Sequence, residues 1–231
     1  MQRRQFTIGL LGFAGLVGAT ALPSALAAGL TESDASLGVR AALERGANAA
    51  VGLLGRPGGF LDNPKVRIPL PGFLNEAAKL ARFTGQQKRV DGLVTAMNRA
   101  AEAAVPEAKA LLVQAVKAMS VEDARKIVTG GDNSVTEFFA SKTRVALNAK
   151  FLPIVTAATE KEALVEKYNA LAGKAASTGL LKKDDANLQQ YVTGKALDGL
   201  YLMIGEEERK IRKDPVGTGS AILQKVFGSL R

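Results

Sequence analysis

Apolar residues recur three or four positions apart along most of the chain from Thr31 onward, which is the spacing of one face of an α-helix. The first such run lies within residues 34–54 and contains Leu37, Ala41, Leu43, Ala47, Ala50, Val51 and Leu54. Further runs lie near residues 73–83, 87–119, 120–128, 134–159, 160–175, 185–213 and 220–230. Pro106 and Pro153 fall inside two of them, where a proline is expected to kink or divide the helix. The pattern predicts an all-α fold, a single compact multi-helix domain of about eight or nine helices.

Residues 55–72 break this pattern. The segment holds Pro57, Pro64, Pro69 and Pro71, and several glycines, so it cannot form a helix. Three apolar residues alternate with polar or proline residues towards its end: Val66, Ile68 and Leu70. We expect an extended Pro/Gly-rich segment that lies across the helices, with a short edge hairpin as the alternative.

The N-terminal residues 1–27 are typical of a secretory signal peptide. Arg3 and Arg4 precede an apolar run from Gly9 to Leu22, and Ala25-Leu26-Ala27 provides an A-x-A cleavage site. The paired arginines resemble the twin-arginine signal, although an ordinary secretion signal also accommodates two arginines. We expect cleavage after Ala27, a periplasmic protein of residues 28–231 that forms one helical domain, and no lipid anchor, because no cysteine follows the apolar run.

The composition excludes several kinds of chemistry. The 231 residues include no cysteine, histidine or tryptophan. Zinc, iron–sulfur or haem sites built on thiolate or imidazole are therefore excluded, as are Ser-His-Asp and Cys-His nucleophiles. We expect no cofactor and no metal.

Basic residues outnumber acidic ones by 31 to 22, a net charge of +9. They are spread along the chain among acidic residues, and few aromatic residues are present for stacking on bases. We therefore expect no nucleic-acid partner, and at most a peripheral attraction to an anionic membrane surface.

Several segments carry a resemblance to a known family. They are Gly59-Phe60, Val66–Pro71, Met97–Glu102, Lys195–Leu200, Glu207–Pro215 and Leu223–Phe227. In this order the chain resembles an exported bacterial family of unknown function, domain of unknown function 4197. The resemblance implies an all-helical periplasmic protein and carries no activity, ligand or catalytic residue. Many relatives look like lipoproteins, and this chain departs from them because it lacks the lipid-bearing cysteine.

Three polar residues stand out in an alanine-rich helical run: Asn98, Arg99 and Glu102. They lie within one turn of each other, and the surrounding alanines allow another element to approach closely. Such a buried cluster could form a binding site. The alternative is a clamp between helices, in which Glu102 pairs with an arginine from another helix.

Two more candidates lie on the predicted last long helix. Lys195 and Asp198 are three residues apart, and could face a ligand opposite Asn98 and Glu102 or form a surface ion pair. Further along, Glu206 with Lys210 and Glu208 with Arg212 have the spacing of helical ion pairs. Asp184 or Asp185 is the expected N-cap of this helix.

The leading hypothesis is a non-catalytic periplasmic protein that binds an envelope protein or an apolar, lipid-like ligand. The first alternative is a carboxylate-dependent, hydrolase-like enzyme that uses Glu102 as general base with Arg99 or Lys195. The second is a purely structural envelope protein. An enclosed pocket lined by Asn98, Glu102 and Asp198 would favour the binding or enzymatic functions, and a solid core the structural one.

Overall fold

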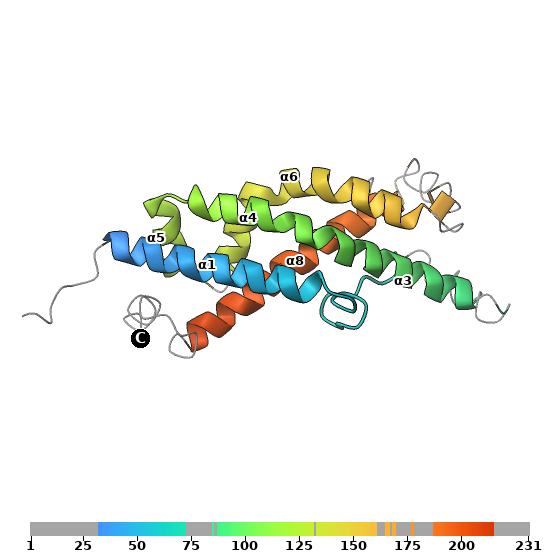
Figure 1. Cartoon of the computed structure of the whole chain (residues 1–231), viewed down its shortest axis with the longest axis horizontal. Helices are drawn as coiled ribbons and strands as arrows, with labels where there is room; N and C mark the ends of the chain where they lie inside the picture. Colours follow the sequence, from blue (N-terminus) through green and yellow to red (C-terminus); the bar gives the residue numbers. More distant parts are fainter. Residues whose placement is uncertain are drawn as a thin grey trace, which may run out of the picture.

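The computed structural model of the chain describes residues 32–72, 85, 87–131, 133–160, 165–166, 168–169, 177 and 187–214. Within these residues the secondary structure is helical and contains no strand. Figure 1 shows an elongated bundle in which α8 crosses obliquely behind the other helices. The predicted signal peptide, the runs near 73–83 and 220–230 and most of the run near 160–175 lie outside the described residues.

Six α-helices and one 3-10 turn are described, in the order α1 (Glu32–Leu54), α3 (Gln87–Ala104), η1 (Val105–Glu107), α4 (Ala108–Lys117), α5 (Val121–Thr129), α6 (Ser134–Thr159) and α8 (Leu188–Lys213). The all-α prediction is confirmed, but this count is lower than the predicted eight or nine. Three of the predicted runs lie wholly or mostly outside the described residues, and Pro153 lies within the 26-residue helix α6. Pro106 does interrupt its run, because η1 separates α3 from α4, yet the two helices follow nearly the same line in Figure 1.

The core lies where α8 packs against α6, α3 and α1. Small side chains allow this close packing, and Ala100, Ala101, Ala104 and Ala108 are completely buried along α3, η1 and α4. Larger side chains fill the remaining space, among them Phe139, Leu147 and Phe151 of α6 and Leu197 and Leu200 of α8. Burial of each large side chain contributes about 1.5–3 kcal/mol, so the described residues form one compact unit.

Two helix starts show how the local sequence sets the boundaries. Ser120 caps α5, because its hydroxyl accepts a hydrogen bond from the Asp123 amide at 3.0 Å while the Asp123 carboxylate accepts one from the Ser120 amide at 3.1 Å. This reciprocal pair is a capping box in which Asp takes the place of the usual Glu. The cap predicted for α8 is wrong, since Asn187 is its N-cap and accepts a hydrogen bond from the Gln190 amide at 3.0 Å.

Residues 55–72, which we call the strip, follow α1 and lie along α3, where Phe60 and Ile68 contact Glu102 and Asn98. Turns occupy its first part, where Gly58 has a φ of +83° that favours glycine, and residues 67–71 run without turns. Phe60, Val66 and Ile68 are buried. The predicted extended conformation is therefore present only in residues 67–71, and no strand of an edge hairpin is present within the described residues.

Candidate functional site

Glu102, near the end of α3, binds the strip through its carboxylate. Its Oε1 accepts hydrogen bonds from the backbone amides of Phe60 and Leu61, each at 3.0 Å. Its Oε2 accepts a hydrogen bond from Arg99 Nη1 at 2.6 Å, one turn earlier on the same helix. The residue is only 4% exposed. Both carboxylate oxygens are therefore engaged within the protein.

These contacts determine the charge state of Glu102. Burial alone would raise the pKa of this carboxyl, but the amides of Leu61 and Phe60 and the Arg99 guanidinium together hold the pKa below its ordinary value. A buried carboxylate that accepts several hydrogen bonds is stabilised in its charged form. Glu102 is consequently an ionised anchor, whose low basicity does not suit a general base near neutral pH.

Asn98 binds the strip seven residues after Leu61, at Ile68. Its Oδ1 accepts a hydrogen bond from the Ile68 amide at 2.8 Å, and its Nδ2 donates one to the Ile68 carbonyl at 2.9 Å. Nδ2 also donates to the carbonyl of Val94, one turn earlier in α3, at 2.8 Å. Asn98 is completely buried. Its amide thus satisfies both main-chain polar groups of one strip residue, as a paired strand would.

The cluster of Asn98, Arg99 and Glu102 therefore exists, and it holds the strip on α3. The sequence-based alternative of a clamp between two helices is wrong in one respect. The arginine that pairs with Glu102 is Arg99 of the same helix, and the clamped element is a non-helical segment whose amides have no helical partners. None of the pockets found along the described residues is lined by Asn98, Glu102 and Asp198.

Lys195 and Asp198 lie on α8 and make contacts that do not involve the Asn98–Glu102 cluster. Asp198 accepts a hydrogen bond from Arg144 Nη1 of α6 at 3.0 Å, and Lys195 lies over the ring of Tyr191 at 5.8 Å. Among the described residues no hydrogen bond or ion pair joins these two side chains to each other, or either of them to Asn98 or Glu102. The expected ion pair between them is wrong because Arg144 reaches Asp198 from the neighbouring helix.

The other face of the strip lies on α8. Gly199 faces the strip, and a Cβ at this position would lie 2.8 Å from the ring of Phe60 and 3.2 Å from Val66. Tyr191 donates a hydrogen bond through its hydroxyl to the carbonyl of Pro69 at 3.1 Å. The strip is thus held between the polar side chains of α3 and a small-residue surface of α8.

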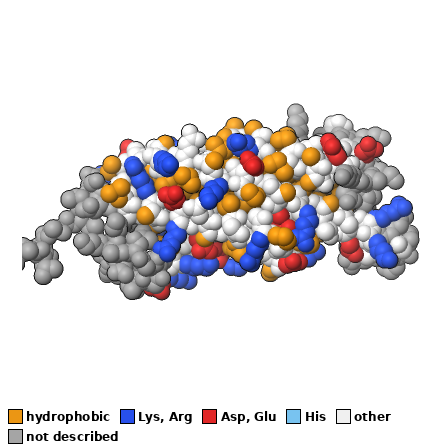
Figure 2. All heavy atoms as spheres, viewed as in Figure 1, with side chains coloured by type: hydrophobic (Ala, Val, Ile, Leu, Met, Phe, Trp, Pro, Cys, Tyr) orange, Lys and Arg blue, Asp and Glu red, His pale blue; other side chains and the backbone are white. Residues whose placement is uncertain are grey.

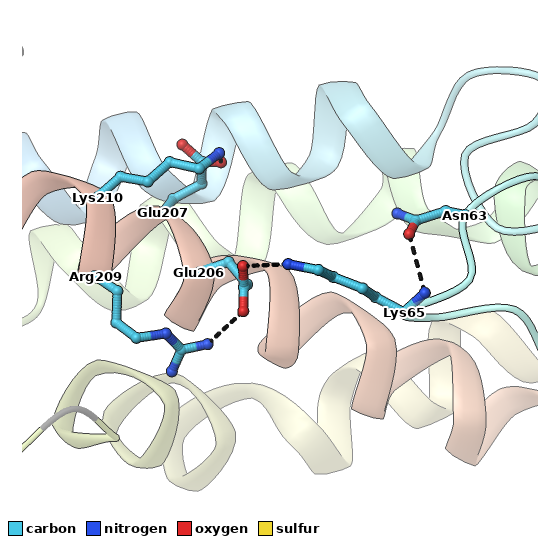
Figure 3. A network of polar contacts seen from close by, with 6 residues as sticks. All are labelled: Asn63, Lys65, Glu206, Glu207, Arg209 and Lys210. Atoms are coloured by element: carbon cyan, nitrogen blue, oxygen red, sulfur yellow. Dashed lines mark hydrogen bonds and ion pairs between the residues drawn. The ribbon is translucent and has the colours of Figure 1, made fainter.

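Figure 3 shows a third attachment of the strip, at the charged end of α8. Lys65 Nζ lies 2.7 Å from Glu206 Oε2, and Arg209 Nη2 lies 2.8 Å from Glu206 Oε1. The hydrogen bonds from Lys65 and Arg209 lower the pKa of Glu206 to about 2. The predicted pair of Glu206 with Lys210 is wrong, because Lys65 and Arg209 occupy Glu206 while Lys210 pairs with Glu207 at 2.5 Å.

Glu208 and Arg212 form the ion pair that their spacing predicts, and it is mostly buried. Arg212 donates to Glu208 Oε1 from Nε at 2.8 Å, and to the Ile127 carbonyl of α5 from Nη2 at 2.7 Å. Burial raises the pKa of Glu208, although Arg212 and Ser134 oppose this effect. Glu208 Oε2 is buried and has no hydrogen-bond partner among the described residues. The pair joins α8 to α5 and to the start of α6.

A small cavity lies beside this pair. Its volume is about 20 Å³, and its lining is mainly apolar, with Val39, Leu43, Ile127, Val135, Ile204 and Ile211. A cavity of this size holds about one water molecule. It cannot hold a lipid-like ligand in this conformation, so the core of the described residues is nearly solid.

Larger hollows lie on the surface. One of about 590 Å³ lies between α5 and α6 and is lined by Lys126, Phe138 and Lys142 among others. Another, of about 290 Å³, lies between α4 and α6 and is lined by Leu111, Gln114, Ala115, Ala118, Lys142 and Thr143. Sequence reasoning missed both, although one signal was available: residues 138–159 contain three basic residues and no acidic one.

No group of three or more acidic side chains in the described part of the chain is close enough to hold a metal ion. None of its helices combines the length and the hydropathy that a membrane span requires. No site residue is therefore assigned to a metal.

The chain matches the model of a protein family described as a protein of unknown function, DUF4197, over residues 29–228. The chain belongs to this family. No curated protein and no solved structure matches the chain.

The DUF4197 match spans every described helix and the strip. The resemblance noted in the sequence is therefore confirmed. Three of the segments that carry it meet in the structure, because strip residues 59–71 contact both the 97–102 segment of α3 and the 195–200 segment of α8. In this DUF4197 protein, the most distinctive segments thus build the attachment of the strip.

Proposed function

We propose that this protein is a non-catalytic binding protein of the periplasm that engages an envelope partner through its outer surface. The observation that carries the proposal is the saturation of Glu102. Both of its oxygens accept hydrogen bonds from the strip or from Arg99, so the carboxylate has no free oxygen for a substrate. The periplasmic location follows from the signal-like N-terminal residues.

The contacts of Glu102 also bear on the enzymatic alternative. A general base must accept a proton, and the lowered pKa of Glu102 opposes that role. Arg99 is committed to Glu102, and Lys195 lies over Tyr191 with no bond to the cluster. These contacts favour a structural role for the three side chains, and they direct the search for a binding site to the surface.

The surface feature that best fits binding is the outer side of α4 and α6, which we call the α4–α6 face. We define it by Leu111, Ala115 and Ala118 of α4 and by Lys142, Val145, Ala146, Ala149 and Lys150 of α6. Val145 is 87% exposed, more than any other large apolar side chain in the described part of the chain. Figure 2 shows hydrophobic side chains, with both basic and acidic ones among them, over the part of the molecule where Figure 1 places α4 and α6.

The test compares two matched variants for retention on isolated cell envelopes. Ala146→Glu places an acid on the α4–α6 face, one turn after Lys142. Ala49→Glu places the same acid at an exposed position of α1, one turn after Arg45. Both substitutions keep good helix formers and a similar local ion pair. The proposal predicts that only Ala146→Glu releases the protein from envelopes. Equal retention of both variants, or no retention of the wild type, would contradict it.

A second assay addresses the enzymatic alternative directly. Wild type and Glu102→Gln are incubated with ester, amide and glycoside substrates, and the fold of each is followed by circular dichroism. We expect no turnover by either protein. Hydrolysis by the wild type that Glu102→Gln abolishes without unfolding would overturn the proposal.

A further inference from the structure

The charges of the described helices are unevenly distributed, and the α4–α6 face carries the basic excess. The helix α4 contains Lys109 and Lys117 and no acidic residue, and α6 contains Lys142, Arg144 and Lys150 with one acidic residue, Glu137, in its first turn. By contrast, α8 balances its basic residues with Asp198, Glu206, Glu207 and Glu208. The face is thus a local cationic region in a chain whose net charge is +9.

The lysines of this region are available to an external partner. Among the described residues, no ion pair involves Lys117, Lys142 or Lys150, and all three are exposed. Arg144 differs, because Asp198 pairs with it. Asp123, which lines the same surface hollow as Lys142, is engaged in the capping box of α5. Of the two acids that line this hollow, Asp123 therefore has a role within the fold, and Glu137 lies five residues before Lys142 on α6.

Between these lysines the surface is apolar and made of small residues. Val145, Ala146 and Ala149 are exposed on α6, and Pro153 continues the same side of the helix. The hollow between α4 and α6 extends this apolar surface to Leu111 and Ala115. An apolar surface with flanking lysines is typical of proteins that bind at the interface of a lipid bilayer. There the apolar side chains enter the headgroup boundary and the cations meet anionic headgroups.

We propose that the α4–α6 face docks on the surface of a bilayer that contains anionic lipid headgroups. This inference rests on the proposed function and names the partner of the same face. Charge complementarity selects this partner, since Lys117, Lys142 and Lys150 are exposed, form no ion pair among the described residues, and match a surface of dense negative charge. The contact is peripheral, because the exposed apolar residues are small and few.

The test uses the protein purified from producing cells in its exported form and vesicles of defined composition. One set is pure phosphatidylcholine, and the other is phosphatidylcholine with one quarter phosphatidylglycerol. Cosedimentation at low ionic strength should show binding to the anionic vesicles and none to the neutral ones. Raising the salt to about 0.5 M should release the protein, because salt screens charges separated by more than a few ångströms.

The matched variants separate this face from general basicity. Ala146→Glu should weaken the partition onto anionic vesicles about fivefold, the factor that corresponds to one elementary charge near such a surface. Ala49→Glu should leave the partition unchanged. Val145→Ser, at a fully solvated position, should weaken it with no effect on the melting temperature. Helical circular dichroism of each variant verifies that the fold is intact.

The inference is overturned if the wild type does not bind anionic vesicles, or if Ala146→Glu and Ala49→Glu weaken the binding equally. If cell envelopes still retain the wild type and release Ala146→Glu, the partner is an envelope protein, so the lipid inference fails while the proposed function stands. If the face instead joins two copies of the chain, sedimentation without vesicles will show an oligomer that Ala146→Glu dissociates, which also overturns it.

Discussion

The side-chain amide of Asn98 pairs with both main-chain polar groups of Ile68, accepting a hydrogen bond from its amide at 2.8 Å and donating one to its carbonyl at 2.9 Å. A helix side chain thus supplies what a neighbouring strand would supply in a sheet. The strip has no strand partner among the described residues, so this pair satisfies polar groups that would otherwise be buried without hydrogen bonds.

Removal of this amide should destabilise the fold. We expect Asn98→Ala to lower the free energy of unfolding by about 1–3 kcal/mol, because the Ile68 amide and carbonyl lose their partner in a buried place. Urea denaturation followed by circular dichroism measures the change. Asn148→Ala, at a half-buried position of α6, is the control. It should change the free energy of unfolding by less than about 0.5 kcal/mol. Equal effects of the two substitutions would show that the pairing with Ile68 is unimportant.

The close approach of the strip to α8 makes a second prediction at Gly199. A Cβ there would lie 2.8 Å from the Phe60 ring, so Gly199→Ala should destabilise the protein by about 1–3 kcal/mol through overpacking. Gly194, on the same helix, has no atom within 4 Å of the corresponding Cβ position. Gly194→Ala should therefore stabilise the protein by about 0.5–1 kcal/mol, through the higher helix propensity of alanine. Thermal unfolding of both variants decides the matter, and a stabilised Gly199→Ala would refute the described packing.

The anchoring role of Glu102 predicts an asymmetry between the two members of its ion pair. Glu102→Ala leaves the Phe60 and Leu61 amides without an acceptor, and we expect a loss of about 3 kcal/mol. Arg99→Ala should cost about 1 kcal/mol or less, since Arg99 is 45% exposed and solvent screens its charge. Urea unfolding of both variants provides the comparison. A larger loss for Arg99→Ala would show that the ion pair, and not the strip, determines the role of Glu102.

The ion pairs of the strip make its stability dependent on pH. The pKa of Glu206 is lowered from 4.5 to about 2 by Lys65 and Arg209. A lowered pKa in the folded state means that the stabilisation is complete above the unfolded value and is lost as pH falls through the folded value. The difference in urea midpoint between wild type and Glu206→Gln should therefore be constant above about pH 5 and vanish near pH 2. Glu44→Gln, at an exposed position of α1, is the control. A difference in urea midpoint between wild type and Glu206→Gln that grows on acidification would contradict the lowered pKa of Glu206.

The helices were predictable because their apolar periodicity is long and regular, and because Ser120 and Asp123 carry a cap signal that acts within four residues. The cap at Asn187 was missed for the opposite reason. Asp184 and Asp185 carry equally good cap side chains, and the sequence alone offers no means to choose among them. The predicted kink at Pro153 stays a prediction, and α6 includes this proline between the buried residues Phe151 and Val155.

The candidate cluster was predictable in part. The spacing of Asn98, Arg99 and Glu102 placed them together on one helix, but their partners are backbone groups of the strip, which any residue type provides. Partners of this kind leave no pattern in the sequence. The same reason explains why Glu206 was paired with Lys210: the competitor Lys65 lies 141 residues away in the chain. Long-range partners are determined by the packing of the strip on α8, and local spacing does not encode them.

The central claim is that the Glu102 cluster is structural and that the protein works through the α4–α6 face. The most direct measurement is the retention of Glu102→Gln and Ala146→Glu on isolated cell envelopes, at a temperature where both variants are folded. We predict that Glu102→Gln is retained like the wild type and that Ala146→Glu is released. Release of Glu102→Gln together with full retention of Ala146→Glu would contradict the account.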